Sequence, residues 1–454
     1  MLSPSLGRAD AKATVHELLG LPFGAHEMRL ENDMRVVCVP WRRQQALSFY
    51  TLVTVGSRNE TDPGKSGFAH LFEHMMFRGS KRFPAERYEG IMQSIGADNN
   101  AYTTRDYTLY TVSVSKEQLD TLLEIEADRF QYLHYAPSAF KTETGAVLGE
   151  YHTASSDPWQ TLWEKLSEIS YSKHPYQHTT LGYVDDIKAM PGLYDYSLEF
   201  FQTHYLPRNT VVLVVGDIDP AQWFSKIQKH YLGWKNPSVE NNLRQIVPET
   251  PPPRGQTTSV NWPNEKTNRV LIGYRVPGFF KSPSATSADR HSIRELAALE
   301  VLRILLFGPQ SSLVQELVID QQKLLALESW GDFMSRDAGL FVIEAEFSPD
   351  SFSFDELDTR IQRQIDALQL SPPSSIQISR IVSHLLNQKA LSMQRPGDLA
   401  EELASFMART GTLEGRNRFM QALQRTTAKH VKEVARRYLS PSRRFQAQLS
   451  NETK

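Results

Sequence analysis

The sequence is poor in features that mark several classes of protein. Its single cysteine, Cys38, cannot form an internal disulfide, so the fold does not depend on oxidation. The apolar run at residues 36–39 predicts that this cysteine is a buried strand residue. No run of 18 apolar residues exists, which predicts that no segment spans a membrane. The 50 basic and 52 acidic residues nearly cancel, so we expect no nucleic-acid partner and a function that depends on a local site.

Length and composition are those of an ordinary globular protein. Hydrophobic residues make up 40% and charged residues 22% of the 454 positions, and this length suits roughly two to four domains. The first twenty residues lack the apolar core of a secretory signal. An initiator Met can stand in place of a removed export segment, however, so both the cytoplasm and the periplasm stay open as compartments.

A proline-rich polar segment at residues 236–256 divides the chain. It predicts a linker between one domain at residues 1–235 and a second at residues 257–454. Each half contains a Tyr-Leu pair followed by an extended run, and the two pairs lie 233 positions apart. A second pair of glycine-containing strand patterns lies 222 positions apart, at Gly56 and Gly278. The similar offsets indicate an internal duplication.

Periodicity predicts the elements of the first half. Residues 48–55 and 107–114 are rich in β-branched and aromatic side chains and predict strands. Ser66 is an expected N-cap for a helix that ends at Gly79, and one face of that helix is an apolar stripe. Residues 116–134 predict a second helix. A third begins near Pro137 and carries Glu143 and Glu150.

The helix that ends at Gly79 contains the order His-x-x-Glu-His at His70, Glu73 and His74. Two imidazoles four residues apart lie on one helix face and can both reach one zinc ion. Glu73 projects from the same side, where it can take a proton from water as a general base. This order is that of the inverted zincins. The alternative is a pair of core histidines that only hydrogen-bond, but polar groups among Phe and Met are costly without a partner.

A catalytic zinc usually has three protein ligands and one open position. Glu143 and Glu150 lie seven residues apart and therefore share a face of their helix. Such a pair also occurs on solvated helix surfaces, although the neighbouring Val147 and Leu148 favour a buried helix. We therefore expect the third ligand to come from this helix.

Several segments resemble the M16 peptidases, the group of pitrilysin, insulinase and the mitochondrial processing peptidase, and among them the shorter bacterial subunits of M16B type. The 75 residues between His74 and Glu150 are similar to the family's spacing to its third ligand. Glu143 falls where members carry a second glutamate that supports catalysis. The segments that carry the resemblance are SGFAHLFEHMMFRGS, NNAYTTRDYTLY, HPYQHTTLGYVDDI and, more weakly, LLFGPQSSLVQELV in the second half.

The resemblance implies an α+β fold of two homologous α/β-roll halves, each a mixed, mostly antiparallel sheet backed by helices, which enclose the site as a clamshell. It implies one Zn²⁺ per chain and the hydrolysis of extended peptides that bind as an added strand. Asn100 and Ala101 are the expected substrate-binding residues, although the Asn pair there could equally be a plain loop.

One departure from the family concerns residues 310–330, where many members carry an arginine and a tyrosine that reach over the substrate. This chain has neither residue type there. Either the far wall of the clamshell works differently, or a related subunit that lacks the zinc motif supplies the pair, as in the family's heterodimeric members. We therefore expect a partner of similar fold, or at least a dimer. The alternatives to a peptidase are a non-catalytic scaffold or core subunit and a peptide-binding module. The complete ligand set and Glu73 argue against both.

Overall fold

The computed structural model describes residues 13–42, 46–237, 246–247, 249, 255–279 and 289–450. The predicted linker at residues 236–256 lies largely outside this part of the chain. The proposed domain ranges, 1–235 and 257–454, therefore stay predictions.

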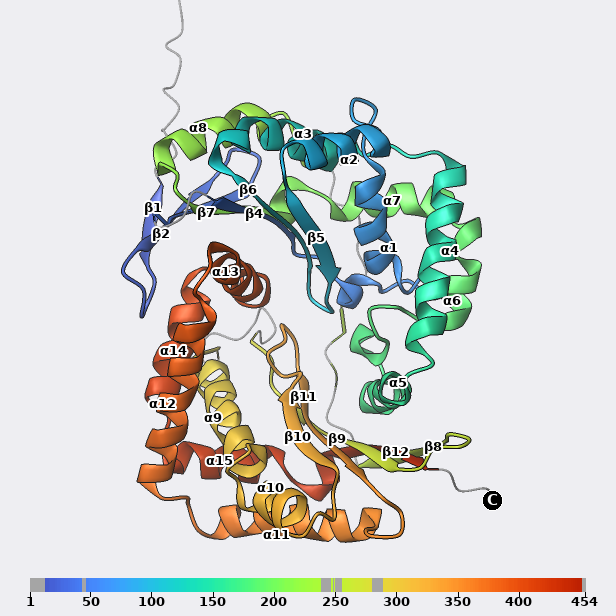
Figure 1. The fold of residues 1–454 in the computed structure, drawn as a ribbon, viewed down its shortest axis with the longest axis vertical. Coiled ribbons are helices and arrows are strands. Elements are labelled where there is room, and N and C mark those ends of the chain that lie inside the picture. Colours follow the sequence, from blue (N-terminus) through green and yellow to red (C-terminus); the bar gives the residue numbers. More distant parts are fainter. Residues whose placement is uncertain are drawn as a thin grey trace, which may run out of the picture.

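Two β-sheets lie one above the other, the first built before the predicted linker and the second after it (Figure 1). The first sheet has the order β1-β2-β3-β7-β4-β6-β5 and the second the order β10-β11-β9-β12-β8. The strands of the first sheet are β1 (Thr14–Glu17), β2 (Gly24–Arg29), β3 (Arg35–Pro40), β4 (Ala46–Val53), β5 (Asp98–Thr103), β6 (Thr108–Ser115) and β7 (Thr210–Gly216). Those of the second are β8 (Gln256–Asn261), β9 (Asn268–Val276), β10 (Ala326–Gly331), β11 (Gly339–Phe347) and β12 (Arg444–Ser450).

The two sheets share one topology. Each contains a single parallel pair among its described strands, β3 with β7 and β8 with β12, and every other pair is antiparallel. Read outward from that pair, β3-β7-β4-β6-β5 corresponds to β8-β12-β9-β11-β10. This correspondence agrees with the internal duplication inferred from the sequence offsets. The expected mixed, mostly antiparallel sheets are therefore observed.

Helices cover the outer face of each sheet. The first core joins one face of the first sheet to helices that include α1, α3, α4, α7 and α8, and the second core joins the second sheet to α9, α11, α12, α14 and α15. The helices of the first half are α1 (Phe68–Met75), α2 (Ala85–Ser94), α3 (Leu119–Tyr132), α4 (Pro137–Ala154), α5 (Pro158–Ser170), α6 (Val184–Ala189), α7 (Tyr194–His204) and α8 (Pro220–Tyr231). Those of the second are α9 (Asp289–Phe307), α10 (Ser312–Val314), α11 (Phe354–Leu370), α12 (Ser375–Ser392), α13 (Pro396–Thr410), α14 (Glu414–Gln424) and α15 (Ala428–Tyr438).

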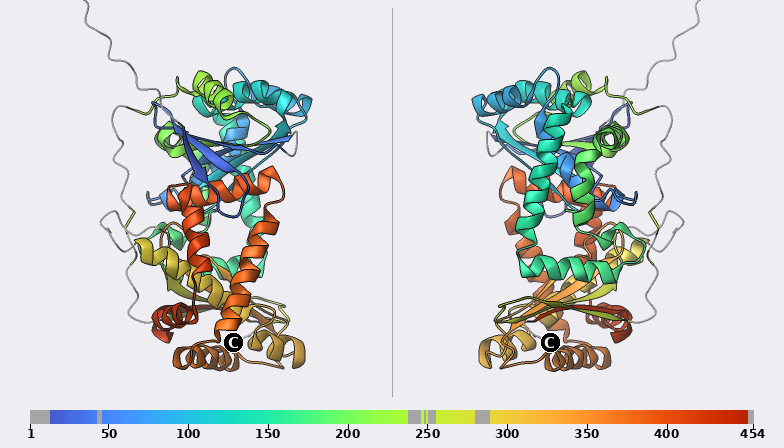
Figure 2. Two further views of the ribbon diagram at one scale, coloured as in Figure 1. Left: turned by 90° about the vertical axis from the view of Figure 1, so that its left-hand side faces the viewer. Right: turned by 90° about the vertical axis from the view of Figure 1, so that its right-hand side faces the viewer.

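The inner faces of the sheets are covered by exchanged helices. Helix α13 of the second half packs on β4 and β7 of the first sheet, and its leucines join a core that contains Val37, Leu52 and Leu213. Helix α5 of the first half packs on β8, β9 and β12, and its Leu162 and Leu166 are fully buried there. The side views show α4 descending towards α5 on one side of the molecule and α12 and α14 rising towards α13 on the other (Figure 2). Each half therefore supplies a layer of the other.

One helical stretch, residues 293–320, is long and apolar enough to span a membrane by length and composition alone. It comprises most of α9 and the turns that follow, and 61% of its most apolar window is buried inside the protein. A core helix passes the same test, and the buried Leu299 and Leu302 in the second core identify this stretch as such a helix. Cys38, predicted to be a buried strand residue, is fully buried in β3.

Candidate metal centre

Helix α1 begins after Gly67, not at the expected cap Ser66. Gly67 adopts a left-handed conformation (φ 87°), and Ser66 instead donates its hydroxyl to Asp186 at 2.6 Å. The carboxylate of Glu60 accepts the N–H groups of Gly67 (2.8 Å) and Ala69 (2.7 Å) and so satisfies the start of the helix. The cap comes from seven residues upstream, which is why the local pattern pointed to the wrong residue. As expected, the helical segment ends before Gly79, through a 3₁₀ turn at Met76–Arg78.

The buried stripe of α1 fixes which way its polar face points. Phe68, Leu71, Phe72 and Met75 are completely buried in the first core. The helix contacts α4 on one side and β5 on another, so its polar residues face these two elements.

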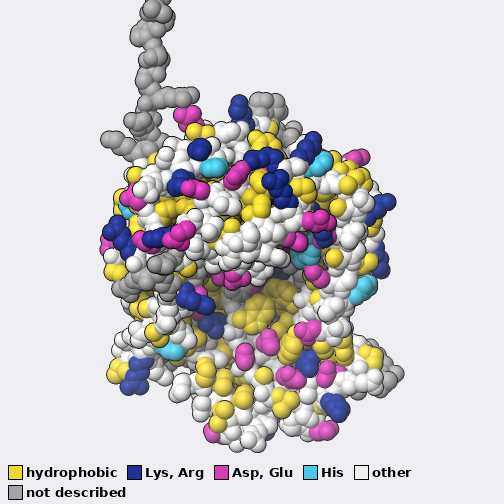
Figure 3. Space-filling model, turned by 45° about the horizontal axis from the view of Figure 1, so that its top comes forward, with side chains coloured by type: hydrophobic (Ala, Val, Ile, Leu, Met, Phe, Trp, Pro, Cys, Tyr) yellow, Lys and Arg dark blue, Asp and Glu magenta, His cyan; other side chains and the backbone are white. Residues whose placement is uncertain are grey.

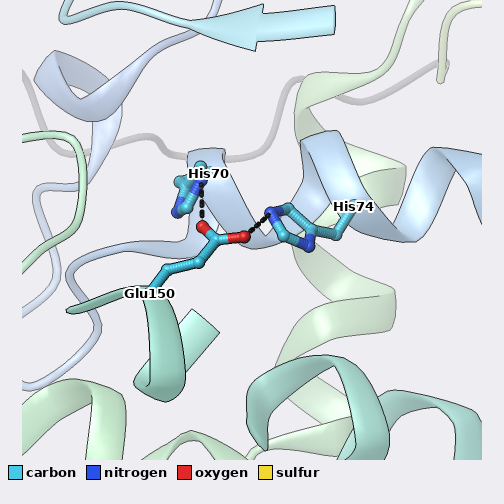
Figure 4. A group of neighbouring side chains, drawn as sticks. All are labelled: His70, His74 and Glu150. Carbon is cyan, nitrogen blue, oxygen red and sulfur yellow. Dashed lines mark ion pairs between the residues drawn. The ribbon is translucent and has the colours of Figure 1, made fainter. Parts of the chain in front are cut away.

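The predicted ligands converge between α1 and α4 (Figure 4). Nε2 of His70 lies 3.3 Å from Oε2 of Glu150, and Nε2 of His74 lies 3.5 Å from Oε1 of the same carboxylate. One donor atom from each of the three residues lies within 4.8 Å of the other two, and no other such group of His, Cys, Asp or Glu occurs among the described residues. Side chains 76 and 80 positions apart in the chain therefore meet at one point.

The donor set suits a zinc ion. Two ligands that each bind zinc at about 2.0–2.1 Å in tetrahedral geometry lie about 3.3–3.4 Å apart. Each histidine nitrogen lies near that spacing from one oxygen of the Glu150 carboxylate, His70 at 3.3 Å from Oε2 and His74 at 3.5 Å from Oε1. Burial, together with the charge of the neighbouring His74, lowers the pKa of His70 from 6.5 to about 4, so its imidazole is neutral near pH 7. Neutral imidazole is the form that binds metal, through its unprotonated ring nitrogen.

A second carboxylate lies behind His74. Oε2 of Glu143 is 3.4 Å from Nδ1 of His74, and its Oε1 pairs with Arg78. A carboxylate at the far nitrogen of a ligating histidine orients the ring and raises its basicity. Glu143 is buried. Its sequence alternative, an exposed carboxylate on a helix surface, is therefore wrong. The described residues offer no corresponding partner to Nδ1 of His70.

Glu73 contacts strand β5 and lies close enough to the predicted ligands for the charges of His74 and Glu150 to act on its carboxylate. Its Oε2 accepts a hydrogen bond from the Thr103 hydroxyl, with 2.7 Å between the two oxygens. Burial raises the pKa of Glu73 above its ordinary value, although the bond from Thr103 opposes that shift. Thr103 had no individual role in our sequence prediction, because its pairing with a residue 30 positions away leaves no local signal.

The predicted substrate-binding residues lie on an edge strand. Asn100 and Ala101 belong to β5, so the loop alternative is wrong. Among the described strands β5 pairs with β6 alone and ends the first sheet. The backbone N–H of Ala101 donates to the side-chain oxygen of its own neighbour, Asn100, at 2.9 Å. The edge therefore presents a backbone donor to the space beside α1. Figure 3 shows a hollow between the two halves of the molecule.

Comparison with known proteins agrees with this geometry. Residues 39–183 match the family model described as insulinase (peptidase family M16), and residues 194–385 match that of the M16 inactive domain. The chain belongs to peptidase family M16.

Relatives within the family carry protease names. The chain is 28% identical to the zinc protease PqqE of Helicobacter pylori over 401 residues, which cover 87% of this chain and 86% of that protein. It is 22% identical to the beta subunit of the mitochondrial processing peptidase of Lentinula edodes, over 90% of this chain and 86% of that one. The crystal structure of a protease from Helicobacter pylori superposes with a TM-score of 0.84 at 25% identity, covering 94% and 99% of the two chains. These relatives support a metallopeptidase and the two-domain clamshell.

Proposed function

We propose that this chain is a zinc-dependent endopeptidase that cuts extended peptides. The observation that carries the proposal is the convergence of His70, His74 and Glu150 at spacings that suit one tetrahedral ion. Two neutral nitrogens and one carboxylate leave the ion a net positive charge and a fourth position. We propose one zinc ion per chain.

A zinc ion held by these residues would supply Lewis acidity, which polarises a peptide carbonyl and acidifies water. Glu73 is the proposed general base. Its raised pKa brings the carboxylate closer to the operating pH, and the bond from Thr103 holds one of its oxygens in a fixed direction. Proton removal by Glu73 lets the water oxygen attack the carbonyl carbon, and the same carboxyl group then delivers the proton to the departing amine.

The substrate would bind as an added strand on β5. The N–H of Ala101 now donates to the Asn100 side chain, and a substrate carbonyl can take over that bond when the exposed Asn100 side chain turns away. Backbone pairing of this kind selects an extended conformation and not a particular side chain. We therefore propose unfolded segments or peptides as the substrate class.

Glu73→Gln tests the base. The variant keeps the volume of the side chain and all three ligands, so we expect full zinc content and a loss of turnover of about 10²- to 10⁴-fold. Zinc is measured by elemental analysis and turnover with a quenched fluorescent peptide library. Glu89→Gln, on the exposed side of α2, is the matched control. Cleavage by Glu73→Gln at the wild-type rate would show that the base is another group.

The partner proposed from residues 310–330 rests on the absence of arginine and tyrosine in that segment. In the structure the segment leads through α10 to β10, the edge strand of the second sheet and the counterpart of β5. A related subunit without the zinc motif would supply the missing side chains. Light scattering after size exclusion on co-expressed neighbouring gene products tests the assembly. Full peptidase activity from a demonstrated monomer would contradict it.

A further inference from the structure

The β5–β6 hairpin reaches from the first half into the second. At its tip, residues 104–107, Nη1 of Arg105 donates to Oδ2 of Asp332 at 2.7 Å. The next residue, Asp106, accepts the backbone N–H of Arg336 at 2.8 Å. The second half therefore holds the tip through two consecutive side chains.

The contact between Arg105 and Asp332 lies inside the protein. Their side chains are only 9% and 14% exposed. The other end of the guanidinium donates to the Ser167 hydroxyl at 2.8 Å and to the carbonyl of Tyr176 at 3.1 Å. A planar fork with partners on several sides has one orientation. Removal of its carboxylate would leave a buried charge without its counter-ion, so the tip depends on Asp332.

The tip is also rigid along the chain. The hydroxyl of Thr104 accepts the N–H groups of Asp106 and Tyr107, both at 3.1 Å, and its own N–H donates to the carbonyl of Tyr107 at 2.8 Å. Thr103, which holds Glu73, directly precedes this turn. A displacement of Arg105 is therefore passed to Thr103 through a turn that has little freedom to absorb it.

We propose that Asp332 of the second half is a positioning residue for Glu73. It fixes Arg105, the rigid tip fixes Thr103, and Thr103 orients the carboxylate that takes the proton. The inference rests on the proposed function, and it gives the half that lacks zinc ligands a part in the reaction. Misplacement of a reacting group by about 1 Å can cost about 100-fold in rate, so a contact this remote can matter.

Asp332→Asn tests the inference. We expect kcat to fall about 10- to 100-fold, KM to stay within about twofold and zinc content to be unchanged. Hydrogen exchange of the backbone at residues 98–108 should become faster in the variant, and this measurement needs neither peptide nor partner. The control is Glu414→Gln, the same chemical change in another pair between the halves, since Glu414 contacts His16 at 2.8 Å far from the hairpin. The control should keep wild-type kcat and hairpin exchange.

A second pair of variants covers the case in which Asp332→Asn does not fold. Arg105→Lys keeps the charge that faces Asp332 and should retain more kcat than Arg105→Gln, and equal losses would overturn the inference. It also fails if Asp332→Asn has wild-type kcat, if kcat falls without faster hairpin exchange, or if Glu414→Gln loses as much kcat. Wild-type turnover by Glu73→Gln would contradict both the assignment of Glu73 as the base and this inference. If Glu73→Gln is inactive while Asp332→Asn is fully active, only the positioning role of Asp332 is contradicted.

Discussion

Substitutions at Glu143 test how the proposed zinc ligand His74 is held. Its Oε2 lies 3.4 Å from Nδ1 of His74, and its Oε1 pairs with Arg78. Loss of a carboxylate that orients a ligating histidine typically weakens metal binding about 10- to 100-fold. We expect substitutions at Glu143 to lower zinc affinity within that range.

The contacts of Glu143 predict which substitution lowers zinc affinity more. Gln keeps the volume and an oxygen that can still accept from His74, and it loses only the charge that faces Arg78, so Glu143→Gln should weaken zinc binding about tenfold. Glu143→Ala removes the acceptor, leaves a cavity and deprives Arg78 of its carboxylate. We expect a loss of about 100-fold, equivalent to about 2.7 kcal/mol of binding free energy.

A chromophoric chelator that competes for zinc measures both affinities. Glu89→Gln, an exposed carboxylate on α2, should bind zinc as the wild type does. Wild-type affinity in Glu143→Ala, or a greater loss in Gln than in Ala, would refute the role of Glu143 in orienting His74.

Two further predictions concern an ion pair between the halves, at Asp337, and the packing of the hairpin tip against Gly56. Although burial opposes it, the hydrogen bond with His174 and the charge of Arg58 lower the pKa of Asp337 from 3.8 to about 2, so its contribution to stability is complete above pH 3.8 and is lost as the pH falls through 2. The melting temperature of Asp337→Asn should therefore change less than that of the wild type across this window, and parallel curves would contradict the assignment. A Cβ on Gly56 would lie 2.6 Å from the carbonyl oxygen of Arg105, so Gly56→Ala should lower the free energy of unfolding in urea by about 1–3 kcal/mol. Gly90→Ala, in a helix with open space around it, should be neutral or stabilising, and equal effects would show that crowding is not the cause.

Features encoded within one element could be predicted from the sequence. The apolar stripe and polar face of α1 follow from helical spacing, and the bounds of β4 and β6 lie within two residues of the expected strands. The position of Glu150 came from the family spacing, because nothing within α4 distinguishes it from any other helix glutamate.

Features that depend on distant residues could not be predicted. Glu60 caps α1 in place of Ser66, Thr103 holds Glu73, and Arg105 crosses to Asp332. In each case the residue type allows many partners, and only the packed chain selects one. The exchange of α5 and α13 could not be predicted either. Their amphipathic patterns indicate that one face of each helix is buried, but not which sheet covers it.

Because α5 and α13 are exchanged, the two duplicated units of the sequence are not independent folding units. Duplication indicates two equivalent units, yet a fragment that ends before the second half would lack α13 and expose the apolar side of its central strands, where Val37, Leu52 and Leu213 now have no contact with water. The reciprocal fragment would lose α5 from above Leu271 and Val342. Neither unit is a self-sufficient globule, so the chain should melt in a single cooperative transition.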